Sequence, residues 1–257
     1  MIKAAFFDVD GTLLSHKTKQ VPQSARAALE KLKAAGVKCV VATGRQIKEM
    51  QKLPVGDIPF DGYITLNGQL LLDENRNVLH GTPLTGKAKE HLLRLYNEKI
   101  IPALLVEVED VYLNFVDERV RTVQEAISSA VPPLGEYSGR DIYQVCAYMA
   151  EGDEAVLSPI VDDCVMTRWN LGGMDIIAKG GGKVTGIKRY LEANGISPEE
   201  IIAFGDGEND MEMLQFAGIG VAMGNAWENV KRCADYVTAD IDDDGIEKAL
   251  KHFGLIE

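Results

Sequence analysis

Two aspartates, Asp8 and Asp10, stand two residues apart in the segment Asp-Val-Asp-Gly-Thr-Leu that spans residues 8–13. Two carboxylates this close repel each other unless a cation lies between them or one takes up a proton, and both arrangements serve phosphoryl transfer. The segment directly follows a short apolar run over residues 4–7, which predicts a strand. Because ligands of an open parallel sheet gather at the carboxyl ends of its strands, this position favours a site over a plain Asp-Gly turn.

A second acidic segment, Gly-Asp-Gly-Glu-Asn-Asp, spans residues 205–210 and lies between a short predicted strand and a predicted helix. It would bring the carboxylates of Asp206 and Asp210 and the amide of Asn209 to the same edge of the sheet. A calcium-binding loop is the rival interpretation. The segment lacks the alternating ligands and the closing glutamate of such a loop, so we set calcium aside.

Two further segments carry groups that suit a phosphate. Thr43 and Gly44 follow a predicted strand over residues 37–42, where a hydroxyl and an exposed main-chain N–H can bind a phosphoryl oxygen. Lys183 follows three glycines and falls in the first turn of a predicted helix, where the helix dipole already favours an anion. A simple turn at Thr43 and a solvated loop at Lys183 are the alternatives, whereas a Walker phosphate loop does not fit the spacing.

The elements that must position these groups alternate between strand and helix, which is typical of βαβ units. The strands of this kind are predicted over residues 4–7, 37–42, 63–66, 174–178, 201–204 and 219–222. Between them lies a stretch with a different rhythm. It contains predicted helices over residues 87–97 and 118–131 and predicted strands over 103–108, 111–116, 142–149 and 164–170. We therefore expect an α/β fold, with a Rossmann-like doubly wound parallel-sheet core over residues 1–81 and 174–257 and an inserted α+β cap domain over 82–173.

The chain of 257 residues carries 39 Asp and Glu against 27 Lys and Arg, a formal charge of −12. Such a field repels nucleic acid and anionic membranes, so we expect neither as a partner, although a metal ion and local cations can still bind a small phosphate ester. The four cysteines form no CxxC pair, which favours reduced thiols. With no signal peptide and no apolar run near 18 residues, a cytoplasmic location is expected, while the oligomeric state stays open.

Taken in their order along the chain, the four segments resemble the haloacid dehalogenase superfamily of aspartate-nucleophile phosphatases. The DxDGT form at residues 8–12 and the GDGxND form at 205–210 resemble its phosphatase branch, and the insert resembles the cap of the Cof-type phosphatases, subclass IIB. The resemblance spans the whole chain. It implies that Asp8 is the nucleophile and that Asp10 is the general acid and then the general base, a role that members without a carboxylic acid at this position lack.

The same resemblance implies the binding residues and the activity. The residues implied to contact the phosphoryl group are Thr43, Gly44, Lys183 and Asn209. The implied Mg²⁺ ligands are Asp8, the main-chain carbonyl of Asp10, and Asp206, with Asp210 supporting them. The implied reaction is hydrolysis of small phosphate monoesters, sugar phosphates above all, through an aspartyl-phosphate. A sugar phosphomutase and a phosphometabolite-binding protein with a vestigial site are the alternatives.

Overall fold

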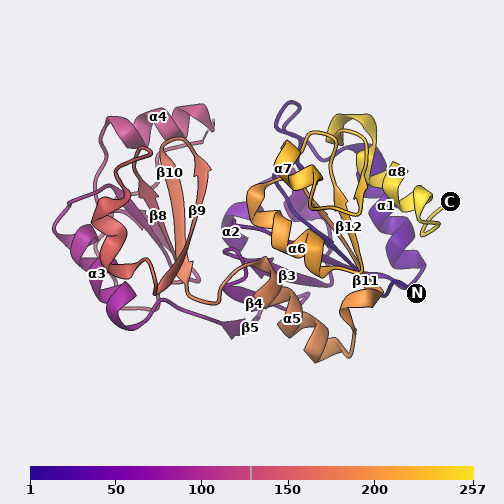
Figure 1. Cartoon of the computed structure of the whole chain (residues 1–257), viewed down its shortest axis with the longest axis horizontal. Helices are drawn as coiled ribbons and strands as arrows, with labels where there is room; N and C mark the ends of the chain where they lie inside the picture. The colour runs from indigo at the N-terminus through magenta and orange to yellow at the C-terminus, as the bar shows by residue number, and fades with distance from the viewer. Residues whose placement is uncertain (128) are drawn as a thin grey trace. The chain divides into compact units, whose positions relative to one another are not determined.

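The computed structural model describes residues 1–127 and 129–257, and these divide into two compact units (Figure 1). The first, called the core unit below, comprises Met1–His80 and Gly182–Glu257, and the second, called the inserted unit, comprises Gly81–Gly181. Among the helices described, none combines the length and the apolar character that crossing a membrane requires.

The core unit is built on an eight-stranded sheet with the order β13-β12-β11-β1-β2-β3-β4-β5. Its strands are β1 (Ala4–Phe7), β2 (Lys38–Ala42), β3 (Gly62–Thr65), β4 (Leu70–Leu72), β5 (Val78–Gly81), β11 (Ile201–Gly205), β12 (Ile219–Ala222) and β13 (Tyr236–Val237). All neighbours from β13 to β3 pair in parallel, and β4 pairs antiparallel with β3. The carboxyl ends of the parallel strands therefore lie along one edge, where the chemical groups of the sequence are expected.

Helices cover both faces of this sheet (Figure 1). They are α1 (Gln23–Ala34), α2 (Ile47–Met50), α5 (Lys183–Asn194), α6 (Met211–Phe216), α7 (Glu228–Lys231) and α8 (Gly245–His252), with short 3₁₀ turns at Pro54–Asp57, Pro198–Glu200, Glu208–Asp210 and Ile241–Asp243. Successive strand residues point to opposite faces. Phe6 packs in one cluster with Ile187 of α5 and Leu214 of α6. Phe7, which points to the other face, stacks on Phe204 with 5.0 Å between the ring centroids. The predicted doubly wound α/β fold is confirmed.

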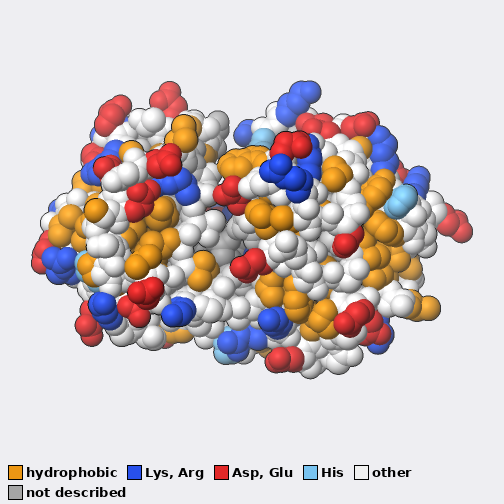
Figure 2. Space-filling view, viewed as in Figure 1, with side chains coloured by type: hydrophobic (Ala, Val, Ile, Leu, Met, Phe, Trp, Pro, Cys, Tyr) orange, Lys and Arg blue, Asp and Glu red, His pale blue; other side chains and the backbone are white. Residues whose placement is uncertain are grey.

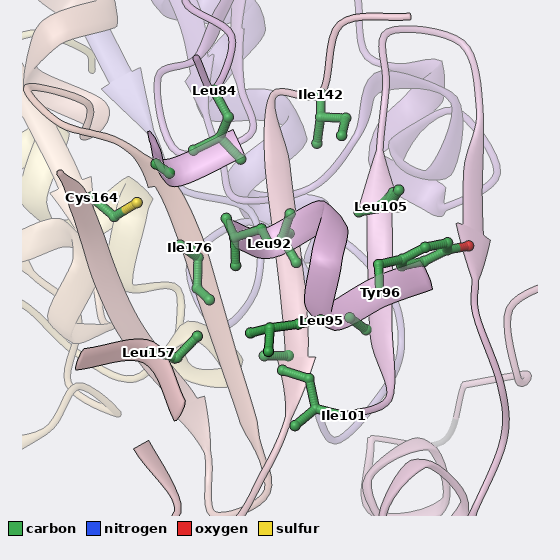
Figure 3. Packing of buried hydrophobic residues seen from close by; sticks show 14 of the residues in the cluster. Leu84, Leu92, Leu95, Tyr96, Ile101, Leu105, Ile142, Leu157, Cys164 and Ile176 are labelled. Atoms are coloured by element: carbon green, nitrogen blue, oxygen red, sulfur yellow. The ribbon is translucent and has the colours of Figure 1, made fainter. Parts of the chain in front are cut away.

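The inserted unit has a five-stranded antiparallel sheet with the order β7-β6-β8-β10-β9. Its elements are α3 (Gly86–Asn97), β6 (Ala103–Val106), β7 (Val111–Leu113), α4 (Glu118–Ala126), β8 (Gln144–Tyr148), a 3₁₀ helix (Glu154–Ile160), β9 (Cys164–Asn170) and β10 (Gly173–Ala178). Figure 3 shows Leu92, Leu95 and Tyr96 of α3 directed toward the strands that carry Leu105 and Ile176. One face of this sheet is thus buried under α3.

The boundary between the units differs from the expected one. Residues 174–178, which the sequence assigns to the core, belong to β10, and β10 pairs antiparallel with β8 and β9 of the inserted unit. An apolar run predicts a strand but not the sheet that receives it, and here the tight β9–β10 connection holds the strand beside β9. The chain re-enters the core unit at Gly182, not at residue 174. The helix predicted over 118–131 is shorter, ending at Ala126, and residue 128 lies outside the described residues.

Charged side chains are spread over the surface. Figure 2 shows Asp and Glu side chains interspersed with Lys and Arg over the visible face. Salt screens exposed charges beyond about 8–10 Å, so the electrostatics of a site depend mainly on the groups that immediately surround it.

Candidate active site

Four loops of the core unit carry the groups singled out in the sequence, and they meet at the carboxyl edge of the parallel sheet. Three of them follow β1, β2 and β11, which are neighbours in the sheet order β11-β1-β2. The fourth is the start of α5, whose first residue is Lys183. The structure therefore assembles, on adjacent strand ends, residues that lie up to about 200 positions apart in the sequence.

A buried ion pair forms the centre of the site. The Nζ atom of Lys183 donates to Oδ1 of Asp8 at 2.6 Å and to Oδ1 of Asp210 at 2.5 Å. All three residues are buried, with exposed fractions of 2%, 6% and 0%. Buried charges are tolerated only when they are paired and hydrogen-bonded, so these three side chains depend on one another.

Burial sets the proton affinities of this group. Desolvation of the Asp8 carboxylate raises its pKa well above the usual range; Lys183 opposes the shift, and the carboxylates of Asp210 and Asp206 add to it. Desolvation alone would lower the pKa of Lys183, but the two carboxylates that it contacts outweigh burial and raise it. When these carboxylates are all ionised, their negative charge exceeds the positive charge of the Lys183 ammonium.

Gly11 and Thr12 bring Asp206 close to the loop that follows β1. Thr12 donates through Oγ1 to Oδ1 of Asp206 at 2.8 Å. Gly11 has a φ of +85°, and a Cβ atom at this position would lie 2.1 Å from Oδ2 of Asp206. Only glycine permits both the conformation and the close approach. Desolvation, followed by the Asp210 carboxylate, raises the pKa of Asp206 to about 7, although the Thr12 hydrogen bond opposes the shift.

Asp210 shapes the loop that carries Asp206. Its Oδ2 atom accepts hydrogen bonds from the main-chain N–H groups of Asp206 at 3.0 Å and Gly207 at 2.9 Å, while Oδ1 binds Lys183. Both oxygens of Asp210 are thus engaged by the protein itself. This arrangement suits a residue that fixes the position of a candidate metal ligand, here Asp206, through the main chain of its loop.

The donor set fits a divalent cation. Carboxylate oxygens of Asp8, Asp206 and Asp210 all lie within 4.8 Å of one another. Three carboxylates against one ammonium leave an excess of negative charge, and hard oxygen ligands are those that Mg²⁺ prefers. The carboxylate of Asp10 is not among these three.

Asp10 is held by Arg45, a residue to which the sequence analysis gave no role. The guanidinium donates from Nε to Oδ2 at 2.6 Å and from Nη2 to Oδ1 at 2.8 Å, a bidentate pair. Both side chains are about one-third exposed, unlike the buried pair of Asp8 and Lys183. Arg45 directly follows Gly44, so its position beyond β2, next to β1, is the signal that could have found it.

Thr43, Gly44 and Asn209 surround a second residue without a predicted role, Asn67. The Thr43 side chain is buried, and its Oγ1 accepts a hydrogen bond from the main-chain N–H of Arg45 at 3.1 Å. Asn209 donates from Nδ2 to Oδ1 of Asn67 at 3.1 Å, and a Cβ atom on Gly44 would lie 3.1 Å from the Asn67 amide. The sequence signal for Asn67 is its place directly after the third predicted strand.

The chain is similar to known proteins over nearly its whole length. The family described as haloacid dehalogenase-like hydrolase matches residues 5–250. YkrA of Bacillus subtilis strain 168 is 32% identical over 260 residues, covering 99% of each chain.

Two solved structures extend the comparison. BT1666 of Bacteroides thetaiotaomicron, described among phosphatases of this superfamily, is 36% identical with a TM-score of 0.91, covering 100% of this chain and 96% of that one. BT4131, described as a subclass IIB sugar phosphatase, is 36% identical with a TM-score of 0.85, covering 99% and 100%.

Proposed function

Because the chain belongs to the haloacid dehalogenase-like hydrolases and is a phosphatase of subclass IIB, we propose that it hydrolyses small phosphate monoesters, sugar phosphates above all, with Mg²⁺ as cofactor. Asp8 is the nucleophile and Asp10 transfers the proton. The observation that carries this assignment is the contrast between the two carboxylates: Asp8 is buried beside Lys183, while Asp10 is partly exposed and held by Arg45.

The carboxylates of Asp8 and Asp206 and the main-chain carbonyl of Asp10 would hold Mg²⁺, with Asp210 fixing the loop of Asp206. When bound, Mg²⁺ supplies positive charge that offsets the repulsion between the Asp8 carboxylate and a dianionic phosphate ester. Desolvation and Asp210 raise the pKa of Asp206 to about 7, so its ionised form is destabilised without a cation, and a bound cation would stabilise that form.

In the first half-reaction, an oxygen of Asp8 attacks phosphorus, the bond from phosphorus to the leaving oxygen breaks, and an aspartyl-phosphate forms. Asp10, protonated at this stage, gives its proton to the leaving alkoxide. Lys183 lies 2.6 Å from the attacking carboxylate, so its ammonium is within reach of a phosphoryl oxygen on Asp8. Thr43, Gly44 and Asn209 contribute further donors to the phosphoryl oxygens.

In the second half-reaction, water attacks the same phosphorus while the ionised Asp10 takes a proton from it. The bond between Asp8 and phosphorus breaks, which returns the carboxylate and releases inorganic phosphate. The two N–H groups of Arg45 are donors and suit the ionised Asp10. We expect this pair to loosen when Asp10 carries its proton in the first half-reaction.

One solved relative supports the proposed substrate class. BT4131, which shares 36% identity over nearly the whole chain, is described as a sugar phosphatase, and a sugar phosphate is the kind of small monoester that this chemistry serves. A phosphomutase would use the same nucleophile but would require a bisphosphate activator.

The test is a panel of sugar phosphates and an aryl phosphate, assayed for release of inorganic phosphate with Mg²⁺ and with a chelator. We expect release that requires Mg²⁺, proceeds without a bisphosphate, and falls to background in Asp8→Asn. A folded Asp8→Asn variant that retained turnover would falsify the assignment of the nucleophile. Release only after addition of a bisphosphate would favour the phosphomutase.

A further inference from the structure

The turn between β3 and β4 is hydrogen-bonded to two of the residues assigned to the phosphoryl group and to the residue directly before a third. It contains Asn67, whose main-chain N–H donates to the carbonyl of Thr43 at 3.0 Å. The Asn67 carbonyl accepts from the N–H of Gly182, the residue before Lys183, at 3.0 Å. Its side-chain Oδ1 accepts from Asn209 at 3.1 Å. One residue is thus bonded to the loop after β2, to the start of α5 and to the loop after β11.

Close packing reinforces this junction. A Cβ atom on Gly68 would lie 2.1 Å from the carbonyl oxygen of Gly182, and one on Gly186 would lie 2.4 Å from Ile64 of β3. The first turn of α5 therefore rests directly on the β3–β4 turn, beside the strands that Figure 1 shows next to α5. Movement of the turn would carry Lys183 with it.

The turn adopts a conformation that its residues do not favour locally. Leu66 and Asn67 both have a φ of +52°, and asparagine tolerates this left-handed region better than leucine does. Gln69 is buried, yet its side-chain amide has no hydrogen-bond partner among the described residues. Such features persist where the surroundings over-determine them, and they cluster at functional sites.

From these contacts we propose that Asn67 is a positioning residue, which holds Thr43, Lys183 and Asn209 in the register that binds the transferring phosphoryl group. The proposal rests on the proposed function and adds a residue to it. Asn67 is suited to the task because its main chain fits the left-handed turn while its amide reaches Asn209. A displacement near 1 Å at a catalytic group costs about 100-fold in rate, so the expected effect is kinetic.

The test compares two substitutions. Asn67→Gly keeps the left-handed conformation and both main-chain bonds but removes the bond to Asn209. We expect turnover to fall and the inhibition constant of inorganic phosphate to rise, each by about tenfold or more, with an unchanged unfolding midpoint. Asn67→Ala removes the same bond and also disfavours the positive φ, so we expect a larger loss of turnover. Asn77→Gly, which removes an exposed contact with Asp73, is the matched control.

A double-mutant cycle separates positioning from a general structural role. If Asn67 acts through Asn209, the double variant with Asn67→Gly and Asn209→Ala should lose little more turnover than the variant with Asn209→Ala alone. Wild-type protein and Asp8→Asn, measured in the same assay, report on the proposed function independently. Three outcomes would overturn the proposal and leave the nucleophile assignment untouched. The Asn67→Gly variant could keep wild-type turnover, or it could fail to fold. The losses of turnover from the two single substitutions could also multiply fully in the double variant.

Discussion

Asp8 and Asp10 stand two residues apart, yet each is paired with a cation in a different environment. Asp8 shares Lys183 with Asp210 in a buried cluster whose side chains are at most 9% exposed. The Asp10 and Arg45 side chains are 31% and 36% exposed. The buried ion pairs therefore contribute to the stability of the fold. In the outer pair, water screens the attraction between the two charges and competes for their hydrogen bonds. This difference suits the roles proposed above, with Asp8 as a fixed nucleophile and Asp10 as a proton carrier whose partner can change.

The largest expected effect is a loss of turnover, with little loss of stability, when the outer pair of Asp10 and Arg45 is altered. Asp10→Asn keeps the shape of the side chain but removes the proposed proton-transfer group, so turnover should fall by about 10² to 10⁴. The free energy of unfolding should change by no more than about 1 kcal/mol, because the lost ion pair is screened by solvent. Steady-state turnover and urea unfolding measure the two quantities. Asp57→Asn, at an exposed position, is the control, and near wild-type turnover in Asp10→Asn would remove Asp10 from the mechanism.

In the buried cluster, by contrast, we expect a substitution to lower the free energy of unfolding strongly. Lys183→Met conserves much of the volume of the side chain but leaves Asp8 and Asp210 buried without their cation. Removing one partner of a buried pair costs about 3–5 kcal/mol, so the free energy of unfolding should fall by that amount. Lys188→Met, on an exposed position of the same helix, should change it by no more than about 0.5 kcal/mol. A loss below about 1 kcal/mol in Lys183→Met would mean that the two pairs do not differ as described.

Metal binding offers a third comparison, through pH. As a proposed Mg²⁺ ligand, Asp206 would have to be ionised to bind the metal, and its pKa is raised to about 7. The ionisation of Asp206 alone should therefore increase the apparent dissociation constant of Mg²⁺ by about tenfold for each pH unit below 7. Isothermal titration calorimetry at several pH values measures it, and an affinity that does not change between pH 5.5 and 8 would contradict the expectation.

The same raised pKa has a consequence for folding. The carboxylate ionises near pH 3.8 in the unfolded chain and near 7 in the metal-free fold, so the fold binds more protons between these values. The contribution of Asp206 to the stability of the metal-free protein should accordingly fall as pH rises from about 4 to 7. Saturating Mg²⁺ should reduce this loss, because it binds the ionised form.

The smallest expected effect is on the stability of an Arg45 variant. Arg45→Met breaks the bidentate pair with Asp10, but both side chains are about one-third exposed, so the free energy of unfolding should fall by about 1 kcal/mol or less. Urea unfolding beside Lys183→Met gives the direct contrast. A loss in Arg45→Met as large as that in Lys183→Met would show that the outer pair is as structural as the buried one.

Much of the fold could be predicted because strands and helices leave local patterns. The apolar residues Ala25, Ala28, Leu29 and Leu32 recur at helical spacing and are the buried residues of α1. The run over 174–178 was correctly predicted as a strand but was assigned to the wrong unit. Its partner strands lie elsewhere in the chain, and the strand pattern carries no information about which sheet accepts it.

For the candidate site, the residue types and their positions after strands or in the first turn of a helix were enough to nominate Asp8, Lys183, Asp206 and Asp210, which the structure brings together. Arg45 and Asn67 were missed. Arginine after a glycine and asparagine before one are common in turns, so neither stands out until the neighbouring strands are known.

The sequence by itself determined the α/β class, the strand ends that carry chemistry and the set of carboxylates, because these depend on local spacing and residue type. Only the tertiary structure decided that Asp8 is buried while Asp10 meets Arg45 at a partly exposed position, and that Asn67 joins three loops. Burial and contacts between distant segments arise when the sheet brings its strand ends together, and no interval along the chain records them.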